Sequence, residues 1–286
     1  MTFLDEGYPE SLKHIDDAPI VLYVVGNLPQ DSECLVAIVG SRNATLYGLG
    51  MAERFAGELA EMGVVIISGL ARGIDAAAHR GCLKSGGRTV AVLGCGLDVI
   101  YPVENRKLYE EIRQKGVIIS EFPFGTDPLP FNFPRRNRIV SGLSAAVLVV
   151  EANIKSGALI TAEFAVEQGK DVFAIPGRVD SPQSGGPHHL IRQGAKLVIS
   201  VGDILEELAV EPIVSSNPEV PGQPRPLGDL GIQEARMMEI LREGEFSMDE
   251  LETRTGLSVP LLIPTLLSLQ IRRLVREKPG KIYEAL

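Results

Sequence analysis

The sequence lacks the marks of a membrane or secreted protein. Its 286 residues contain no apolar run of about 18 residues, the length that begins to suggest a membrane-spanning helix. The N-terminal segment, MTFLDEGYPESLKHIDDAP, is acidic and does not show the positively charged and then apolar order of a secretory signal. We therefore expect a cytoplasmic protein with no membrane association.

Cysteine is scarce as well. Cys34, Cys82 and Cys95 are widely spaced and form no CxxC pair, so neither a disulfide framework nor a zinc site is indicated. The adjacent His188 and His189 make poor metal-ligand geometry. We expect three reduced, mostly buried thiols, and no metal or other cofactor.

The chain has no excess of basic residues. It carries 28 Lys and Arg against 37 Asp and Glu, a formal net charge of −9. Proteins that coat duplex DNA through bulk electrostatics usually show a strong basic excess or a basic face, so this class is disfavoured. A nucleic-acid ligand would need a concentrated local site, with binding that weakens as salt rises.

What the sequence does contain is an alternation of short apolar runs and amphipathic helical stretches between residues 35 and 208. This pattern is typical of a parallel sheet covered on both faces, an α/β doubly wound fold. The predicted strands are residues 35–39, 64–67, 89–93, 117–120, 146–150, 171–175 and 196–199. Glycine or a small polar residue follows nearly every run, and ligands of open α/β sheets bind outside the carboxyl ends of the strands. We expect these loops to line one crevice.

The domain organisation follows from composition. We assign residues 1–34 to an N-terminal extension, 35–211 to a Rossmann-like domain, 212–228 to a linker with five prolines, and 229–286 to a winged-helix-like domain. The last segment shows helical patterns at 234–243, 247–256 and 260–274, with a capping box at Ser247 and Glu250 and a hairpin at Pro279-Gly280. It holds eight basic and ten acidic residues, so a protein–protein or regulatory role is slightly favoured over DNA contact.

The stretch from Phe131 to Glu163 holds the strongest functional signal. Arg135, Arg136 and Arg138 form a tight cluster, in which Arg135 and Arg138 would share a helix face and could grip phosphates. Beyond the next strand, Lys155-Ser156-Gly157 precedes a helical pattern and places backbone N–H groups at a helix N-terminus. The arrangement suits polyanion binding better than bond-breaking chemistry.

Two earlier junctions add anion-binding candidates. Gly40-Ser41-Arg42 follows the first strand, where Gly40 permits close approach and Ser41 and Arg42 can reach an anion; the alternative is a tight turn with an incidental arginine. This turn is not the GxGxxG dinucleotide fingerprint. Gly69 of the second junction offers a backbone donor, while we favour structural or capping roles for the nearby Asp75 and His79.

Aromatic residues lie beside the arginine cluster. The loop FPFGTDPLPFNFP contains Phe122, Phe124, Phe131 and Phe133. Phenylalanines next to arginines are the combination expected for stacking unpaired bases while their phosphates are held, although core burial is the default for most of these rings. We expect one or two of them to meet a ligand.

In these motifs, the chain closely resembles the DNA-processing protein A (DprA/Smf) family. The matching segments run in order from about Tyr8 to Leu208: VAIVGSRNATLYG, ISGLARGIDAAAHRGCL, TVAVLGCGLDVIYP, FPRRNRI, EANIKSGALITAEFAVEQGKDVFAIPG and SGGPHHLIRQGAKLV. The match to the winged-helix module is loose. Of the helical SAM-like domain found at the N-terminus of many members, this chain has at most the trailing part.

The resemblance implies an extended Rossmann-like fold that binds single-stranded DNA in a positively charged pocket, dimerises, and loads the RecA recombinase during natural transformation. It implies phosphate contacts by Ser41, Arg42, Gly69, Lys155, Ser156 and Gly157, with an aromatic residue of the Phe124–Phe133 loop stacking a base. Together with the residues above, the predicted DNA-binding set is Gly40, Ser41, Arg42, Gly69, Phe124, Arg135, Arg136, Arg138, Lys155, Ser156 and Gly157. No catalytic residue is assigned.

Two other hypotheses remain open. The same superfamily includes nucleotide-binding N-glycosidic hydrolases of the lysine decarboxylase-like group, whose PGGxGTxxE loop holds phosphate and supplies a catalytic glutamate. The corresponding SGALITAE, ending at Glu163, has Thr161 but neither the paired glycines nor the Thr-x-x-Glu spacing. The third hypothesis is a structural or regulatory nucleotide-binding protein without turnover.

Overall fold

The computed structural model describes residues 1–208, 232–242, 244–255, 257, 262, 265–266, 269, 274–278 and 282–285. The chain divides into two compact units, Met1–Ser216 and Asn217–Leu286. The predicted linker, 212–228, lies outside the described residues, and the predicted domain boundaries stay a prediction. No helix in the described part of the chain is both long and apolar enough to cross a membrane.

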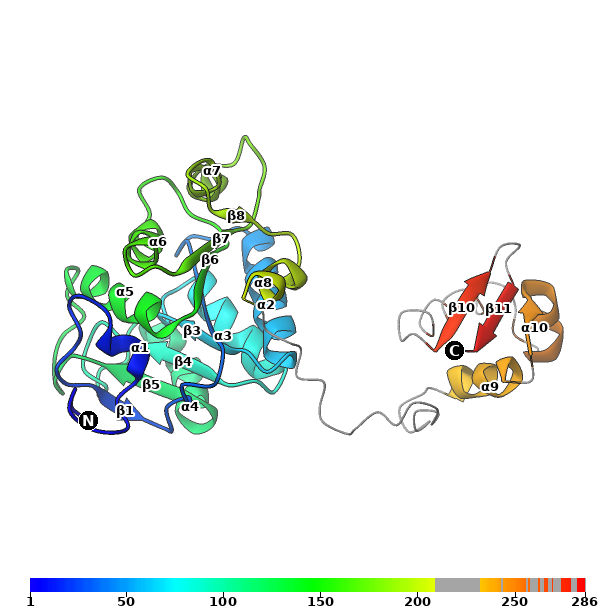
Figure 1. Cartoon of the computed structure of the whole chain (residues 1–286), viewed down its shortest axis with the longest axis horizontal. Coiled ribbons are helices and arrows are strands. Elements are labelled where there is room, and N and C mark those ends of the chain that lie inside the picture. The colour runs from blue at the N-terminus through cyan, green and yellow to red at the C-terminus, as the bar shows by residue number, and fades with distance from the viewer. Residues whose placement is uncertain are drawn as a thin grey trace. The chain divides into compact units, whose positions relative to one another are not determined.

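An eight-stranded sheet forms the centre of the first unit, in the order β1-β5-β4-β3-β2-β6-β7-β8 (Figure 1). The strands are β1 (Tyr23–Val25), β2 (Leu35–Val39), β3 (Val65–Ser68), β4 (Thr89–Val92), β5 (Val117–Ser120), β6 (Ala146–Val149), β7 (Asp171–Ala174) and β8 (Lys196–Leu197). Strands β2 to β8 pair in parallel, and β1 pairs with β5 antiparallel. The seven predicted strands and the doubly wound α/β class are confirmed.

Helices cover both faces of this sheet. They are α1 (Glu10–Lys13), α2 (Leu46–Glu61), α3 (Ile74–Lys84), α4 (Arg106–Lys115), α5 (Asn132–Leu143), α6 (Gly157–Glu167), α7 (Gly185–Arg192) and α8 (Val201–Glu207), with 3₁₀ turns at Val103–Asn105 and Pro182–Ser184. Alternate strand residues point to opposite faces, so α1, α5, α6 and α7 pack in one core, while α2, α3 and α8 pack in another. Helix α4 closes a third cluster over β4 and β5.

Strand order decides where the ligand crevice can lie. The chain runs from β2 outward through β3, β4 and β5, and then returns to the other side of β2 as β6. The loops after β2 and β6 therefore diverge to opposite faces at adjacent strands. Such a switch point is where open α/β sheets bind ligands.

The second unit contains α9 (Ile232–Leu241), α10 (Met248–Thr255) and an antiparallel sheet in the order β10-β11-β9, with β9 at Phe246–Ser247, β10 at Val275–Lys278 and β11 at Ile282–Ala285. The predicted capping box is present: Ser247 N donates to Glu250 Oε2 at 2.8 Å and Glu250 N donates to Ser247 Oγ at 3.4 Å. Most of the predicted third helix, and Pro279-Gly280, lie outside the described residues. The helices followed by a paired wing agree with the winged-helix class.

The two described basic residues of this wing, Arg276 and Lys278, are paired with acidic residues. Arg276 pairs with Glu284, and Lys278 pairs with Glu284 at 2.7 Å and with Glu245. These pairs favour the protein–protein or regulatory hypothesis for the second unit over strong DNA contact. That role stays a prediction.

The cysteines agree with the sequence-based expectation. All three are free thiols; Cys82 and Cys95 are buried and Cys34 is partly buried. Burial raises the pKa of Cys82 to about 12 and that of Cys95 to about 11, which keeps both thiols protonated and unreactive at neutral pH.

Candidate functional site

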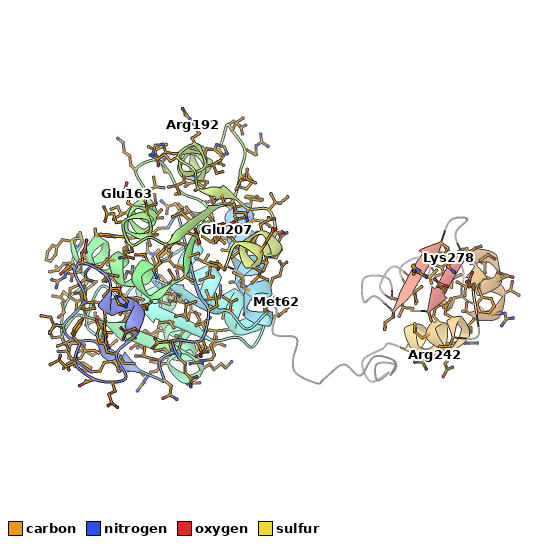
Figure 2. All side chains as sticks on the ribbon, in the orientation of Figure 1. Met62, Glu163, Arg192, Glu207, Arg242 and Lys278 are labelled. Carbon is orange, nitrogen blue, oxygen red and sulfur yellow. The ribbon has the colours of Figure 1, made fainter. Side chains whose placement is uncertain are left out.

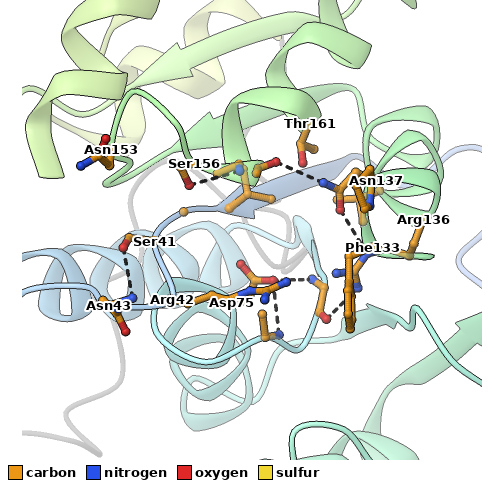
Figure 3. A pocket seen from close by; sticks show the side chains of 18 of the residues that line it. Ser41, Arg42, Asn43, Asp75, Phe133, Arg136, Asn137, Asn153, Ser156 and Thr161 are labelled. Atoms are coloured by element: carbon orange, nitrogen blue, oxygen red, sulfur yellow. Dashed lines mark hydrogen bonds between the residues drawn. The ribbon is translucent and has the colours of Figure 1, made fainter. Parts of the chain in front are cut away.

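A cavity of about 720 Å³ opens at the switch point (Figure 3). Its walls come from the loop after β2, the loop after β3, the Pro128–Pro134 segment leading into α5, and the loop between β6 and α6. These segments span more than 100 residues of the sequence, from Gly40 to Gly157, and the parallel sheet brings them together. The cavity is therefore a product of the fold and not of one motif.

The loop after β2 is held against the end of β6. Ser41 N donates to the backbone oxygen of Glu151 at 2.6 Å, and the buried Glu151 carboxylate accepts from Thr45 N at 2.8 Å and Thr45 Oγ1 at 2.6 Å. The Ser41 hydroxyl accepts from Asn43 N at 3.1 Å, so its own hydrogen stays free to be donated. This loop therefore offers an anion the Ser41 hydroxyl, not the Ser41 amide.

Glycine is required where this loop meets α3. A Cβ on Gly40 would lie 2.6 Å from Ile74 Cγ1. Gly73 has a positive φ of 76°, and a Cβ there would lie 2.2 Å from the Ser41 backbone oxygen. The two glycines let the loops after β2 and β3 come into contact. This contact fixes the position of the Arg42 backbone at the cavity.

The N-terminus of α6 opens directly into the cavity. Ser156 caps the helix by accepting from Ala158 N at 3.3 Å, and a Cβ on Gly157 would meet no atom within 4 Å. Leu159 N donates to Ser156 O at 3.0 Å, so among the described first-turn groups the Gly157 N–H is the one without an acceptor, and it lines the cavity beside the exposed Lys155. Together they form a ready anion site.

Arg136 forms the floor of the cavity and is buried. Its guanidinium donates to Gly69 O at 2.7 Å and to Val92 O, the ends of β3 and β4, and its Nε donates to Asn137 Oδ1 at 3.2 Å. A Cβ on Gly69 would lie 2.5 Å from this guanidinium, so Gly69 is needed for the arginine to fit. Burial lowers the pKa of Arg136 to about 10, which leaves it charged at neutral pH.

An aromatic pair lines one wall. The rings of Tyr101 and Phe133 lie 5.5 Å apart with a 36° tilt, and the Arg42 guanidinium lies 5.0 Å from the centre of the Phe133 ring. Gly94 makes room for Phe133, because a Cβ there would lie 2.8 Å from the ring. The cation over one ring gives the wall both charge and a stacking surface.

The charge of the cavity opposes that of the chain. Among the described residues that line it, Arg42, Arg136 and Lys155 are positive and Asp75 is negative, three charges against one. The whole chain carries −9. Positive groups, helix N–H donors and aromatic rings facing one space suit a ligand that carries phosphate and has a planar group to stack.

Comparison with known proteins gives the family. Residues 1–209 match the model of the DNA recombination-mediator protein A family. The chain belongs to this family. The match covers the entire described part of the first unit, including every loop that lines the cavity.

The relatives of this chain carry the names DNA processing protein DprA or protein Smf. DNA processing protein DprA of Streptococcus pneumoniae is 48% identical over 72% of this chain and 73% of its own length, and its crystal structure superposes with a TM-score of 0.69. Protein Smf of Escherichia coli is 41% identical over 96% of this chain and 74% of its own. DNA processing protein A of Helicobacter pylori, described for its single-stranded DNA binding mode, is 34% identical over 72% of this chain and 94% of its own, with a TM-score of 0.65.

Most of the site residues predicted from the sequence line the cavity of this chain. They are Gly40, Ser41, Arg42, Gly69, Arg136, Lys155, Ser156 and Gly157. The loops after successive parallel strands do converge, as the sequence pattern predicts. DNA contact by these residues stays a prediction.

The expectation of a single phosphate-gripping arginine cluster needs correction. Arg138 is buried and does not line the cavity. It forms a bidentate ion pair with Glu121, with N–O distances of 3.1 Å and 2.8 Å, and its Nε donates to Asp17 Oδ2 at 3.2 Å. Arg135 also pairs with Glu121, at 3.1 Å. Arg135 and Arg138 do share a helix face, but this face is paired with Glu121 and Asp17, and of the three arginines only Arg136 lines the cavity.

Phe124 likewise lies away from the cavity lining. Its ring packs edge-on against Tyr23 of β1, with centroids 5.6 Å apart, and remains 65% exposed. Phe133, from the same loop, occupies the cavity wall instead. The sequence shows four phenylalanines in this loop but not which one the fold turns inward.

Sequence reasoning missed several polar and aromatic residues of the cavity. They are Asn43, Tyr101, Asn137, Asn153, Thr161 and Gln183. Asn137 Nδ2 donates to Gly157 O at 3.2 Å and so ties α5 to the start of α6. Asn43, Tyr101 and Asn153 lie in loops that follow strands, a position that could have identified them.

Proposed function

We propose that this protein binds single-stranded DNA in the cavity, with phosphates held by Arg42, Lys155 and the N-terminus of α6 and a base stacked on the Phe133–Tyr101 wall. The observation that carries the proposal is the convergence of three cations from three separate elements on one cavity of an acidic chain. The relative from Helicobacter pylori, described for single-stranded DNA binding, supports it.

The chemistry favours an unpaired strand over a duplex. Stacking on Phe133 needs a free base face, and stacking within a duplex covers both faces of each internal base. The phosphate contacts carry no sequence information, and aromatic stacking accepts every base. Binding is therefore tolerant of sequence and decreases as salt rises.

The wider role in this proposal is to protect incoming single strands and load the RecA recombinase during natural transformation and recombination. The protein would do so as a homodimer in the cytoplasm, without cofactor or catalysis. Membership of a family with DprA and Smf proteins supports this role.

The hydrolase alternative gains no support from the cavity. Glu163, the acid of the SGALITAE segment, is exposed on α6 and does not line the cavity (Figure 2). Among the described lining residues the only carboxylate is Asp75, which accepts hydrogen bonds from two backbone N–H groups. The acid of the SGALITAE segment is thus not placed to act on a glycosidic bond in this cavity.

The proposal is tested by fluorescence anisotropy of a labelled oligo-dT and of a duplex of the same length, over a salt series. We expect preferential binding of the single strand, with affinity that falls steadily as salt rises. Equal affinity for the duplex would contradict the proposal. Release of base from a nucleoside monophosphate would instead favour the hydrolase.

A matched pair of variants tests the stacking wall. We expect Phe133→Ala to weaken oligo-dT binding about tenfold or more, because loss of a stacked base costs about 1–3 kcal/mol. Phe124→Ala removes the same ring outside the cavity, and we expect it to change affinity less than about twofold. Equal losses, measured by anisotropy, would show that the outer loop and not the cavity holds the base.

A further inference from the structure

One buried acid in the cavity has no role in the proposed function. Asp75 lies in the first turn of α3, is 7% exposed, and lines the cavity between Arg42 and Arg136 (Figure 3). A carboxylate at this place repels a phosphate that enters the same cavity. Its presence in a site for polyanions therefore needs an explanation.

The hydrogen bonds of Asp75 use only one of its two oxygens. Oδ2 accepts from Gly69 N at 3.2 Å and from Ala71 N at 3.4 Å, and so supports the loop after β3. Oδ1 has no hydrogen bond to any described residue. A proton on Oδ1 would therefore leave the loop contacts intact and create a donor.

Burial disfavours the ionised form of Asp75. Burial raises the pKa of Asp75, and the nearby Arg136 of α5 and Arg42 of the first loop only partly offset this effect. His79 lies one turn further along α3. The Thr89 hydroxyl donates to Ile66 O, so it accepts from His79 Nδ1, at 2.7 Å. Burial lowers the pKa of His79 to about 3. His79 is thus neutral at neutral pH, and Lys155 is the other cation that lines the cavity.

We propose that binding of single-stranded DNA is coupled to uptake of a proton from solvent by Asp75, whose Oδ1–H then donates a hydrogen bond to a phosphate oxygen. The coupling rests on the proposed function, because it needs a phosphate in this cavity. One O–H bond forms on Asp75 and no bond of the DNA breaks. The same residue thereby changes from an acceptor that repels phosphate to a donor that binds it, as buried carboxylic acids do elsewhere.

The sign of the pH dependence follows from linkage. A neighbouring phosphate disfavours the ionised carboxylate, so Asp75 has a higher pKa in the complex than in the free protein. The affinity for DNA then rises as the pH falls through the pKa that Asp75 has in the complex. It levels off below the pKa that Asp75 has in the free protein. Each unit between the two values changes affinity by about tenfold.

The asparagine variant mimics the protonated acid. In Asp75→Asn, the amide oxygen can accept from Gly69 N and Ala71 N while Nδ2 donates to the phosphate. We expect this variant to bind oligo-dT with an affinity that does not change with pH and at least equals that of the wild type at low pH. Glu163→Gln, a carboxylate-to-amide change outside the cavity, should follow the wild type.

The experiment is anisotropy with labelled oligo-dT at constant ionic strength from pH 8.5 to 5.5, above the pI of about 5.1. We expect the wild-type affinity to rise by about tenfold over this range. A slope that is the same in Asp75→Asn overturns the proposal. An Asp75→Asn variant weaker than the wild type at every pH, with an unchanged slope, also overturns it and leaves Asp75 as a support for the loop.

A measurement on the wild type alone makes the test independent of the variant's folding. Calorimetric binding enthalpies in buffers of different ionisation enthalpy give the number of protons taken up. A net uptake near pH 6 supports the proposal, and zero uptake over the whole range overturns it. If the wild type binds no single-stranded DNA at any pH, the proposed function itself has failed, which differs from binding without proton uptake.

Discussion

Replacing Arg42 and Lys155 together with alanine is expected to weaken single-stranded DNA binding by about 100-fold or more, since each change removes a charged hydrogen bond worth about 1.5–3 kcal/mol. The two side chains come from different loops, after β2 and after β6, and both are exposed. Their loss should therefore leave the fold and its thermal stability unchanged. The slope of affinity against salt should also decrease, because two phosphate contacts are lost.

A second double variant separates the cavity from the charge of the whole chain. Arg54→Ala with Lys84→Ala removes the same two charges from α2 and α3, outside the cavity lining. We expect it to bind oligo-dT within about twofold of the wild type, since exposed charges away from the contact are largely screened by salt. If this control loses as much affinity as the cavity variant, overall electrostatics and not the cavity governs binding.

The sequence predicts the sheet and the crevice because both depend on local patterns. Strands buried on both faces read as continuous apolar runs, and β2 to β6 are buried at every residue. The carboxyl ends of parallel strands share one edge, so Gly40, Gly69 and Lys155 could be placed together without coordinates. The missed strand, β1, has only three residues and pairs antiparallel at the edge, which leaves little periodic signal.

The orientation of side chains on α5 could not be read from the sequence in the same way. Successive helix residues turn by about 100°, so the adjacent Arg135 and Arg136 point in different directions. Which direction faces the cavity depends on how α5 packs against the sheet, where Ile139, Val140 and Leu143 are buried in the core. Asp17 and Glu121, from other segments of the chain, pair with the arginine face that turns away from the cavity. The acid directly after β5, Glu121, was the available signal that one arginine face would be neutralised.

The pair between Glu121 and Arg138 should be the most costly ion pair to break in this unit. Both side chains are at most 6% exposed, and the pair has two hydrogen bonds. We expect Glu121→Ala to lower the free energy of unfolding by about 3 kcal/mol or more, because it leaves a buried charge without its main partner. The exposed Asp17, at 3.2 Å, would compensate only in part. Urea unfolding followed by circular dichroism measures the loss.

The double replacement Glu121→Leu with Arg138→Met distinguishes a buried pair from a DNA contact. It removes both charges and fills the space with apolar atoms, which is often neutral or stabilising for buried pairs, so most of the stability should return. Arg136 keeps its own bonds to Gly69 O and Val92 O, so the cavity floor should stay in place and oligo-dT affinity should stay within about twofold of the wild type. A stable double variant with tenfold weaker binding would instead show that Arg138 acts on DNA, and would restore the arginine cluster as the phosphate site.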